Sequence, residues 1–576
     1  MITEQPLDRF WIAERLREIS DLVRIRDEEY FPSRTYRRAA ETLEATPTLE
    51  LERRLHEGSL EGLAYVGPVI AEQIVCFATS GRSALLDELR RELPRSLLEL
   101  HRVRGMSLEK AKRLRAAIGV SSVDDLARAC EEGRVRTVRG FGLKTEQSLA
   151  RAVEDYRRQP DHVRHLTAVE IFDAVSMHLA RERAVLDIWP AGEIRRGLET
   201  TGEIGLVCPS SDPARVIEHF GDYPLLARIV STEDSASARV ATARLASGVS
   251  IRVAACVPER AAETLFTETG PALHVLEVRA RMPDRSAEER HASDEVELYR
   301  RAGMRFVEPE VRDDPRLVEE RCAVDAAPLV RGEDILGAVH CHTTHSDGRE
   351  TVFEMARRAK ELGFAYITIT DHSPSAHYAS GVPIDRLRAQ WDEIAEAEEK
   401  VGIRVFRGTE SDILADGALD YPDSILEQLD VVIASIHSRH RMTPEAMTER
   451  IVRCMQLPCF KIWGHPLGRL ILRRPPIQCD VARILDVVAA SNAAIEINGD
   501  PYRLDLAPEW ARLARRRGIR FVLSSDAHST RGLESVRYAV RVARRSGLAA
   551  ADILNTSDRE AFAAAVAPTG IPRRPG

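Results

Sequence analysis

The sequence predicts a multidomain protein of the α and α/β classes, with a closed α/β barrel as its carboxy-terminal domain. Three observations support this. The chain of 576 residues is too long for one hydrophobic core. Its first part has the periodicity of short helices, followed by an α+β segment. Between residues 335 and 567, seven apolar runs alternate with helical patterns, as parallel strands joined by helices do.

The composition is that of a soluble globular protein, with 44% apolar and 30% charged residues. No run of eighteen apolar residues could span a membrane, and the first residues lack the basic start and apolar core of a signal peptide. Nine cysteines without CxxC pairs favour a reducing cytoplasm. We therefore expect a cytoplasmic protein, without membrane contact, that is monomeric.

The barrel prediction rests on the apolar runs and the segments between them. The first run, Leu336–Val339, leads into His340-Cys341-His342. Helical segments such as Val352–Leu362 and Ile384–Lys400 separate the runs. The six later runs are Tyr366–Thr370, Val405–Thr409, Val431–Ile436, Phe460–Gly464, Ile495–Asn498 and Phe521–Ser525.

Most of these runs end in a residue that binds metals. In a regular strand His340 and His342 point to the same face, while Cys341 points to the other and packs. One such pair is equally typical of solvated histidines at a strand edge. In a barrel, however, the carboxyl ends of the strands converge, and nine N and O ligands suit two or three ions. These nine are His340, His342, Asp347, His372, Glu410, His437, His465, Asp526 and His528.

These motifs resemble the PHP (polymerase and histidinol phosphatase) domain. The resemblance implies a distorted seven-stranded barrel with a trinuclear metal centre that hydrolyses phosphoesters, with Mn²⁺ as the activating ion. The ligand types themselves admit Zn²⁺, Mn²⁺ or iron. The matching motifs are His340-x-His342, Ser346-Asp347-Gly348, Asp371-His372, Glu410, His437-Ser438, Gly464-His465-Pro466 and Ser525-Asp526-Ala527-His528.

We expect the ligands to divide among three ions. His340, His342, Glu410 and Asp526 hold the first and are the predicted catalytic residues. Glu410 bridges to a second ion, held by His437 and His465. Asp347, His372 and His528 hold the third.

The helical part carries three turns that resemble helix-hairpin-helix motifs, whose backbone N–H groups bind DNA phosphates. The first has Gly67 but Tyr65 where the motif has its first glycine. The second contains Gly105. The third, with Gly140, Gly142 and Lys144, is the most complete. Together they predict non-specific binding to the DNA backbone, at gapped DNA or a 3′-ended single strand.

The middle of the chain resembles the nucleotidyltransferase palm of the family-X DNA polymerases, the DNA polymerase beta group. Strands are expected at Ala184–Trp189 and Ile204–Cys208, around a Gly192-Glu193-Ile194-Arg195-Arg196-Gly197 motif. The family has Gly-Ser, Arg-Arg-Gly and then Asp-x-Asp. Here Glu193 replaces the serine, and Glu203 and Gly205 replace the two aspartates. Ser250 is expected at the third aspartate position. Two-metal catalysis needs these carboxylates, so we predict a retained fold with a dismantled polymerase site.

The resemblance spans nearly the whole chain and predicts its domain order. No lysine precedes Lys110, so a Schiff-base lyase in the first domain is excluded. We expect a helical domain of DNA polymerase beta type at 1–80, a helix-hairpin-helix domain at 81–158, the degenerate palm at 159–255, a thumb remnant at 256–310, a linker at 311–334, the PHP domain at 335–567 and a disordered tail at 568–576.

The sequence thus predicts a metal-dependent DNA phosphodiesterase, a 3′–5′ exonuclease of DNA repair, that needs two to three divalent ions. Three alternatives stay open: a small-molecule phosphatase like the histidinol-phosphate branch of PHP, a non-catalytic DNA-binding scaffold, and a residual DNA polymerase. A free-standing phosphatase would not need three helix-hairpin-helix turns that bind DNA. A scaffold would not need an intact ligand set.

Overall fold

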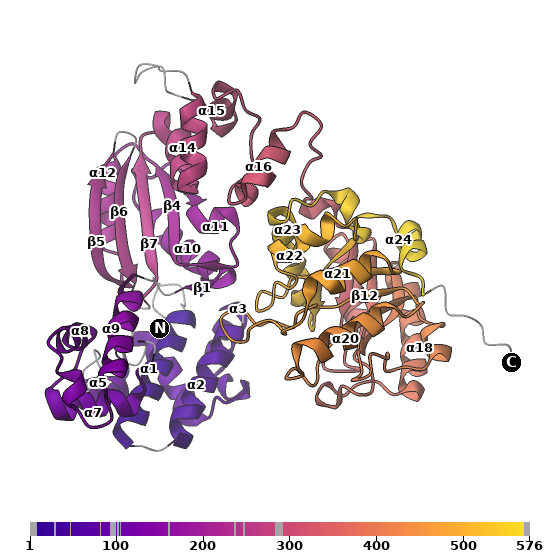
Figure 1. The fold of residues 1–576 in the computed structure, drawn as a ribbon, viewed down its shortest axis with the longest axis horizontal. Coiled ribbons are helices and arrows are strands. Elements are labelled where there is room, and N and C mark those ends of the chain that lie inside the picture. The colour runs from indigo at the N-terminus through magenta and orange to yellow at the C-terminus, as the bar shows by residue number, and fades with distance from the viewer. Residues whose placement is uncertain are drawn as a thin grey trace.

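The fold is described from a computed structural model. It describes residues 9–568 except for 28–29, 47, 81, 93–99, 101–102, 104, 159–161, 236–237, 246–247 and 283–291. The expected disordered tail therefore lies outside the described residues apart from its first residue. Figure 1 shows the barrel on one side, the helical region and the palm on the other, and helix α16 (Pro315–Cys322) between them.

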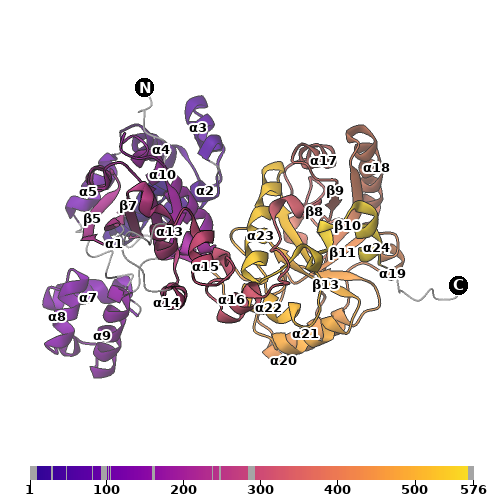
Figure 2. The ribbon, with the colours of Figure 1, turned by 90° about the horizontal axis from the view of Figure 1, so that it is seen from above.

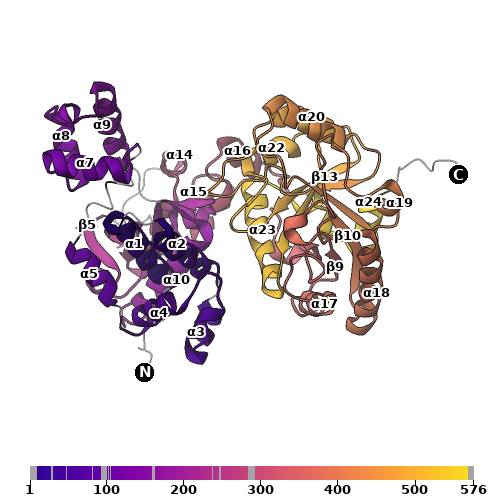
Figure 3. The ribbon, with the colours of Figure 1, turned by 90° about the horizontal axis from the view of Figure 1, so that it is seen from below.

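The amino-terminal helices form two bundles, each with its own apolar core. Leu16, Ile19 and Leu22 are fully buried in the first, as the helical spacing predicts. Leu114 and Leu126 are buried in the second. Figures 2 and 3 show the second bundle as a separate group beside the first. The helices of the first are α1 (Arg9–Asp27), α2 (Tyr30–Ala45), α3 (Thr48–Glu57), α4 (Pro68–Ser80) and α5 (Ala84–Glu92), and those of the second are α7 (Leu108–Ile118), α8 (Val123–Glu131) and α9 (Leu143–Arg158).

The palm is a five-stranded sheet in the order β2-β4-β7-β6-β5, with α10, α11 and α12 among its helices. The strand expected from Ala184 begins only at Trp189. The Asp187 carboxylate accepts the Ile188 N–H and the Trp189 indole N–H, and such local bonds compete with sheet pairing. The strands are β2 (Trp189–Ala191), β4 (Glu203–Pro209), β5 (Leu226–Asp234), β6 (Arg239–Leu245) and β7 (Ser250–Cys256), and the helices are α10 (His165–Leu179), α11 (Gly192–Arg196) and α12 (Pro213–Gly221).

A second, two-stranded sheet pairs β1 (Val163–Arg164) with β3 (Thr200–Thr201). Next in the chain come α13 (Ala261–Thr269), α14 (Ala272–Arg281) and α15 (Glu295–Arg301). The segment expected as a linker, 311–334, contains α16. Its Leu317 and Val318 are buried in the same core as α13 to α15, so this segment is packed.

The carboxy-terminal domain is the predicted closed barrel of seven parallel strands, in the order β10-β11-β12-β13-β14-β8-β9. The register is continuous except for irregularities on both sides of β8. The strands are β8 (Gly337–Cys341), β9 (Tyr366–Ile369), β10 (Arg404–Asp412), β11 (Val431–Ser435), β12 (Lys461–Trp463), β13 (Ala493–Asn498) and β14 (Phe521–Ala527).

Helices cover the outside of the barrel and bury apolar side chains against the strands. Two of them match the predicted helical segments to within one residue. No described helix has both the length and the apolar character needed to cross a membrane. The helices are α17 (Val352–Glu361), α18 (Ile384–Val401), α19 (Asp423–Leu426), α20 (Pro444–Met455), α21 (Val481–Ala489), α22 (Pro508–Arg515), α23 (Val536–Arg545) and α24 (Arg559–Val566).

Candidate metal centre, DNA hairpins and palm site

The carboxyl ends of the barrel strands bring all nine predicted metal ligands together. Their ligand atoms form four overlapping groups, within each of which the atoms lie within 4.8 Å of one another. The groups share members, as ligands of neighbouring ions would. They are His342, Asp347, His372 and His528; His340, Glu410 and His465; His340, His342 and Asp526; and His372, Glu410 and His437.

Glu410, in β10, lies at the centre of this arrangement. One carboxylate oxygen, Oε1, is 2.7 Å from His465 Nε2, 3.2 Å from His437 Nε2 and 3.4 Å from His340 Nε2. The other, Oε2, faces His372 Nδ1 at 2.9 Å and His342 Nε2 at 3.6 Å. A carboxylate with imidazoles on both oxygens has the geometry of a bridging ligand.

Two further carboxylates of the metal centre, Asp526 and Asp347, lie beside the remaining imidazoles. Asp526 Oδ1 lies 3.3 Å from His342 Nε2 and 3.6 Å from His340 Nε2. Asp347 Oδ1 lies 3.4 Å from His528 Nε2 and 3.6 Å from His372 Nε2. His342 Nδ1 is also within 3.9 Å of Asp347, so His342 joins two groups where the sequence assigned it to one ion.

The backbone at His340 differs from the regular strand that predicted its orientation. Its φ is +63°, in the left-handed region, and the register shifts between Ala338 and Cys341. His465 and Asp526 also have positive φ, of 23° and 51°. The orientation of these side chains therefore does not follow from the regular alternation of side chains along a strand. Strained backbone of this kind costs about 1–3 kcal/mol per residue and gathers at functional sites.

The charges of the centre are mutually adjusted. Burial disfavours the ionised form of Glu410, but His437, His340, His372 and His465 hold its pKa well below the usual value. Burial lowers the pKa of His437, and Glu410 and Asp412 more than reverse this, raising it to about 9. The site therefore keeps its carboxylates ionised, as metal binding requires.

Two buried carboxylates behind the ligands were not identified from the sequence. Glu496, in β13, lies 2.5 Å from His340 Nδ1 and accepts hydrogen bonds from the Ser524 hydroxyl and the His465 N–H. Asp412 is 2.8 Å from His437 Nδ1. Each fixes an imidazole so that Nε2 points into the centre. The sequence did contain a signal for both residues, because each is an acidic residue in a buried strand. Asp412 also lies two residues after the ligand Glu410 in the same strand.

The ligand atoms themselves are unsatisfied. His340 Nε2, both ring nitrogens of His342 and both Glu410 oxygens are buried and make no hydrogen bond within the described residues. Buried polar atoms without partners cost about 1–3 kcal/mol each, so native proteins rarely leave several side by side. Imidazole and carboxylate donors at this spacing fit divalent transition-metal ions.

The three hairpins share one turn geometry. Tyr65, Gly105 and Gly140 have φ of 62°, 85° and 90°, and in each case a helix begins three residues later. The intervening residue, Val66, Met106 or Phe141 respectively, is 3% exposed and anchors the turn. The first hairpin therefore keeps the fold, because Tyr65 adopts the conformation that the motif assigns to glycine. Gly67, Gly142 and Lys144 lie exposed at the helix starts.

The palm motif residues lie together but do not form a carboxylate cluster. In the parallel pairing of β4 with β7, Glu203 faces Ser250 and Gly205 faces Arg252. Arg252 was not identified from the sequence as part of this site. Its Nε donates to Glu268 at 2.7 Å. A Cβ on Gly205 would lie 3.0 Å from the Ala191 carbonyl carbon, so β2 leaves little room for a side chain there.

Glu193, in α11, is held by the residue before β4: its Oε2 accepts the Gly202 N–H at 2.7 Å. Burial raises the pKa of Glu203, Arg252 opposes this, and Glu268 and Glu193 add to it. The palm thus has the Arg252 guanidinium near the carboxylates of Glu203 and Glu268, at the position where metal ligands were predicted from the family resemblance.

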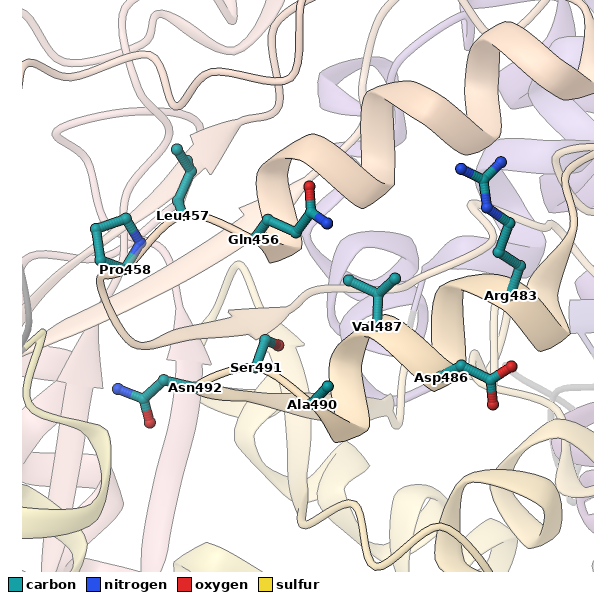
Figure 4. A pocket seen from close by; sticks show the side chains of 9 residues that line it. All are labelled: Gln456, Leu457, Pro458, Arg483, Asp486, Val487, Ala490, Ser491 and Asn492. Atoms are coloured by element: carbon teal, nitrogen blue, oxygen red, sulfur yellow. The ribbon is translucent and has the colours of Figure 1, made fainter.

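One further pocket, of about 440 Å³, lies away from these sites. Figure 4 shows the side chains that line it, from the end of α20, from α21 and from the segments before β12 and β13. Those segments precede the strands, so the pocket is at the opposite end of the barrel from the metal centre. It contains none of the predicted ligands.

Comparison with known proteins agrees with this architecture. Residues 338–499 match the PHP domain, 11–83 a helix-hairpin-helix domain and 97–155 a SAM-like helix-hairpin-helix tandem. The DNA polymerase/3′-5′ exonuclease PolX of Bacillus subtilis is 29% identical over 96% of this chain and 98% of its own length. A probable phosphatase of Caldicellulosiruptor saccharolyticus is 30% identical over 33% of this chain and 78% of its own length.

Proposed function

The chain belongs to the bacterial family-X DNA polymerases that carry a PHP domain, and within that family we propose that it is a metal-dependent 3′–5′ exonuclease without polymerase activity. The observation that carries the proposal is the position of Glu410 among five imidazoles at the carboxyl ends of the barrel strands. The B. subtilis relative, similar over nearly its whole length, is named for both a polymerase and an exonuclease.

The nine side chains would hold two to three divalent ions, Mn²⁺, Zn²⁺ or iron, with Glu410 as the bridge. Such ions supply a Lewis acid and an activated water for phosphodiester hydrolysis. The chain's own part is to keep Glu410 and Asp526 ionised, which the surrounding imidazoles do by lowering the pKa of both carboxyls. Glu496 and Asp412 keep two of those imidazoles oriented.

DNA would be held by the hairpins. Backbone N–H groups at the starts of α4, α7 and α9 would offer phosphate sites, and Lys144 adds a cation at the last of them. These contacts carry no sequence information, so binding would be non-specific.

Template-directed synthesis is not expected of the palm. Gly205 offers no side-chain ligand atom, and Arg252 brings a positive charge beside it. One glutamate, Glu203, cannot hold two ions near a nucleophile and a leaving group.

The discriminating experiment compares a 3′-labelled single strand with a phosphomonoester, in the same sample, with its metal content quantified. We expect release of the labelled 3′ nucleotide with Mn²⁺ and slow turnover of the monoester. A metal-loaded protein that leaves the oligonucleotide intact would overturn the proposal.

The second candidate is a small-molecule phosphatase. It is favoured by the barrel's similarity to proteins named probable phosphatases, such as one from Caldanaerobacter subterraneus that is 29% identical over 38% of this chain and 86% of its own length. Preference for the monoester in the comparison above would select this function.

A further inference from the structure

The palm and the barrel meet at barrel loop 499–506, which follows β13 and supplies a cation to the metal centre. Arg503 Nε lies 3.6 Å from Asp526 Oδ2 and 3.4 Å from Asp500 Oδ2. This Nε is buried and donates no hydrogen bond within the described residues. Arg503 therefore places a positive charge beside the predicted metal ligand Asp526, and its Nε–H is available to donate a hydrogen bond to a substrate.

The backbone of this loop is held by Arg469. Its Nε donates to the Arg503 carbonyl at 2.9 Å, and its Nη2 donates to the Leu504 carbonyl. Arg469 itself follows the ligand His465 by four residues. The Leu467 N–H, in between, donates to Asp505 at 2.9 Å. The two loops are thus one hydrogen-bonded unit next to the centre.

A residue of the palm also forms hydrogen bonds with Arg469. Glu199, directly before β3, pairs with both terminal nitrogens of Arg469, with Nη1 to Oε2 at 3.0 Å. Both side chains are mostly buried. A bidentate arginine–carboxylate pair fixes orientation as well as charge, which a single contact does not.

A second palm residue holds the other side of the loop. The guanidinium of Arg164, in β1, lies over the ring of Tyr502, 4.0 Å from its centroid. Tyr502 precedes Arg503 in the chain, and its carbonyl accepts the Ile471 N–H at 2.8 Å. Arg164 pairs with Thr200, the residue after Glu199, and the His165 N–H donates to the Glu199 carbonyl at 3.0 Å, so Arg164 and Glu199 are held close to each other. Figure 1 shows β1 at the side of the palm that faces the barrel.

We propose that Glu199 and Arg164 are positioning residues of the nuclease: acting through Arg469 and Tyr502, they fix the loop from which Arg503 contacts the phosphate of the bond to be cleaved. The inference rests on the proposed phosphodiesterase function. A guanidinium held at this position stabilises the charge that develops on the phosphate oxygens, and its effect depends on its being fixed in advance. The palm is then retained because the nuclease needs it.

The test uses the full chain with the substitutions Glu199→Gln, Arg503→Ala and both together. Glu199→Gln should lower the single-turnover cleavage rate by about 10- to 100-fold, the cost of misplacing a catalytic group by about 1 Å. Metal content and the dissociation constant for DNA should stay the same. In the Arg503→Ala background the added Glu199→Gln should cost nothing further, because it acts only through Arg503. Glu199→Asp should recover part of the rate.

The matched control is Glu310→Gln. Glu310, in the segment between α15 and α16, pairs with Arg544 of α23 in the barrel at 2.7 Å rather than with loop 499–506, so this variant should cleave at the wild-type rate. A similar loss in Glu310→Gln, a wild-type rate in Glu199→Gln, or additive losses in the double variant would each refute the inference. These results presuppose an active wild type. Absence of cleavage by the metal-loaded wild type would instead refute the proposed function and the inference with it.

Discussion

Replacement of Glu410 by glutamine should remove more than one equivalent of metal, whereas replacement of His528 by alanine should remove at most one. Glutamine keeps the shape of the side chain and removes its charge. Glu410 belongs to two of the four ligand groups and its oxygens face five imidazoles. His528 belongs to one group.

The expected loss of rate follows from that difference. Even an outer partner of a metal ligand is worth about 10- to 100-fold in metal affinity or activity. If each of the two groups that share Glu410 loses at least this much, Glu410→Gln lowers the cleavage rate by about 10² to 10⁴-fold. His528→Ala disturbs one group and should lower it by about 10- to 100-fold.

The assay is single-turnover cleavage of a 3′-labelled oligonucleotide with elemental analysis of the same purified protein. DNA affinity at low salt should be unchanged in both variants, because the hairpins lie on other domains. Glu396→Gln is the control, since Glu396 forms an exposed pair with Lys400 on α18, away from the centre. Full metal content and near-normal cleavage in Glu410→Gln would refute the bridging role.

Three further outcomes are expected. Primer extension on a one-nucleotide gap should give no incorporation with Mg²⁺ or Mn²⁺; extension that is lost on Glu203→Ala would contradict the dismantled palm. Lys144→Ala should reduce the slope of log K against log salt on duplex DNA by about 0.9, and an unchanged slope would place DNA elsewhere. Burial, aided by Arg312, lowers the pKa of His274 to about 4, so from pH 6.5 down to about 4 the unfolded chain binds a proton that the folded chain refuses. Stability should fall over this range, and thermal unfolding of His274→Gln at pH 7 and pH 5 should differ less than that of the wild type.

The seven-stranded barrel was predictable because its runs are long, apolar and regularly spaced. All nine predicted ligands do meet, because strand ends in a barrel converge whatever the local backbone does. The orientation of His340 was not predictable from alternation, since its positive φ depends on the surrounding barrel.

The carboxylates that orient the metal-ligating imidazoles, and the contacts between domains, were harder to predict from the sequence. Glu496 could have been noticed as a charge in an apolar strand, but its partner His340 is 156 residues away. Ser250 was expected at the third aspartate position from its place in a strand, and only the register reveals that Arg252 faces Gly205. The pairing of Glu199 with Arg469 crosses 270 residues and has no local signal.

The neighbourhood of Gly205 also limits how a cation site could be engineered into the palm. An aspartate placed at position 205 would need β2 to move by a few tenths of an ångström and would then face Arg252, which would neutralise its charge. Positions 205 and 252 lie opposite each other on adjacent strands, so the effects of substitutions at the two positions should depend on each other. A single Gly205→Asp substitution is therefore not enough to create a cation site, because the facing arginine must change as well.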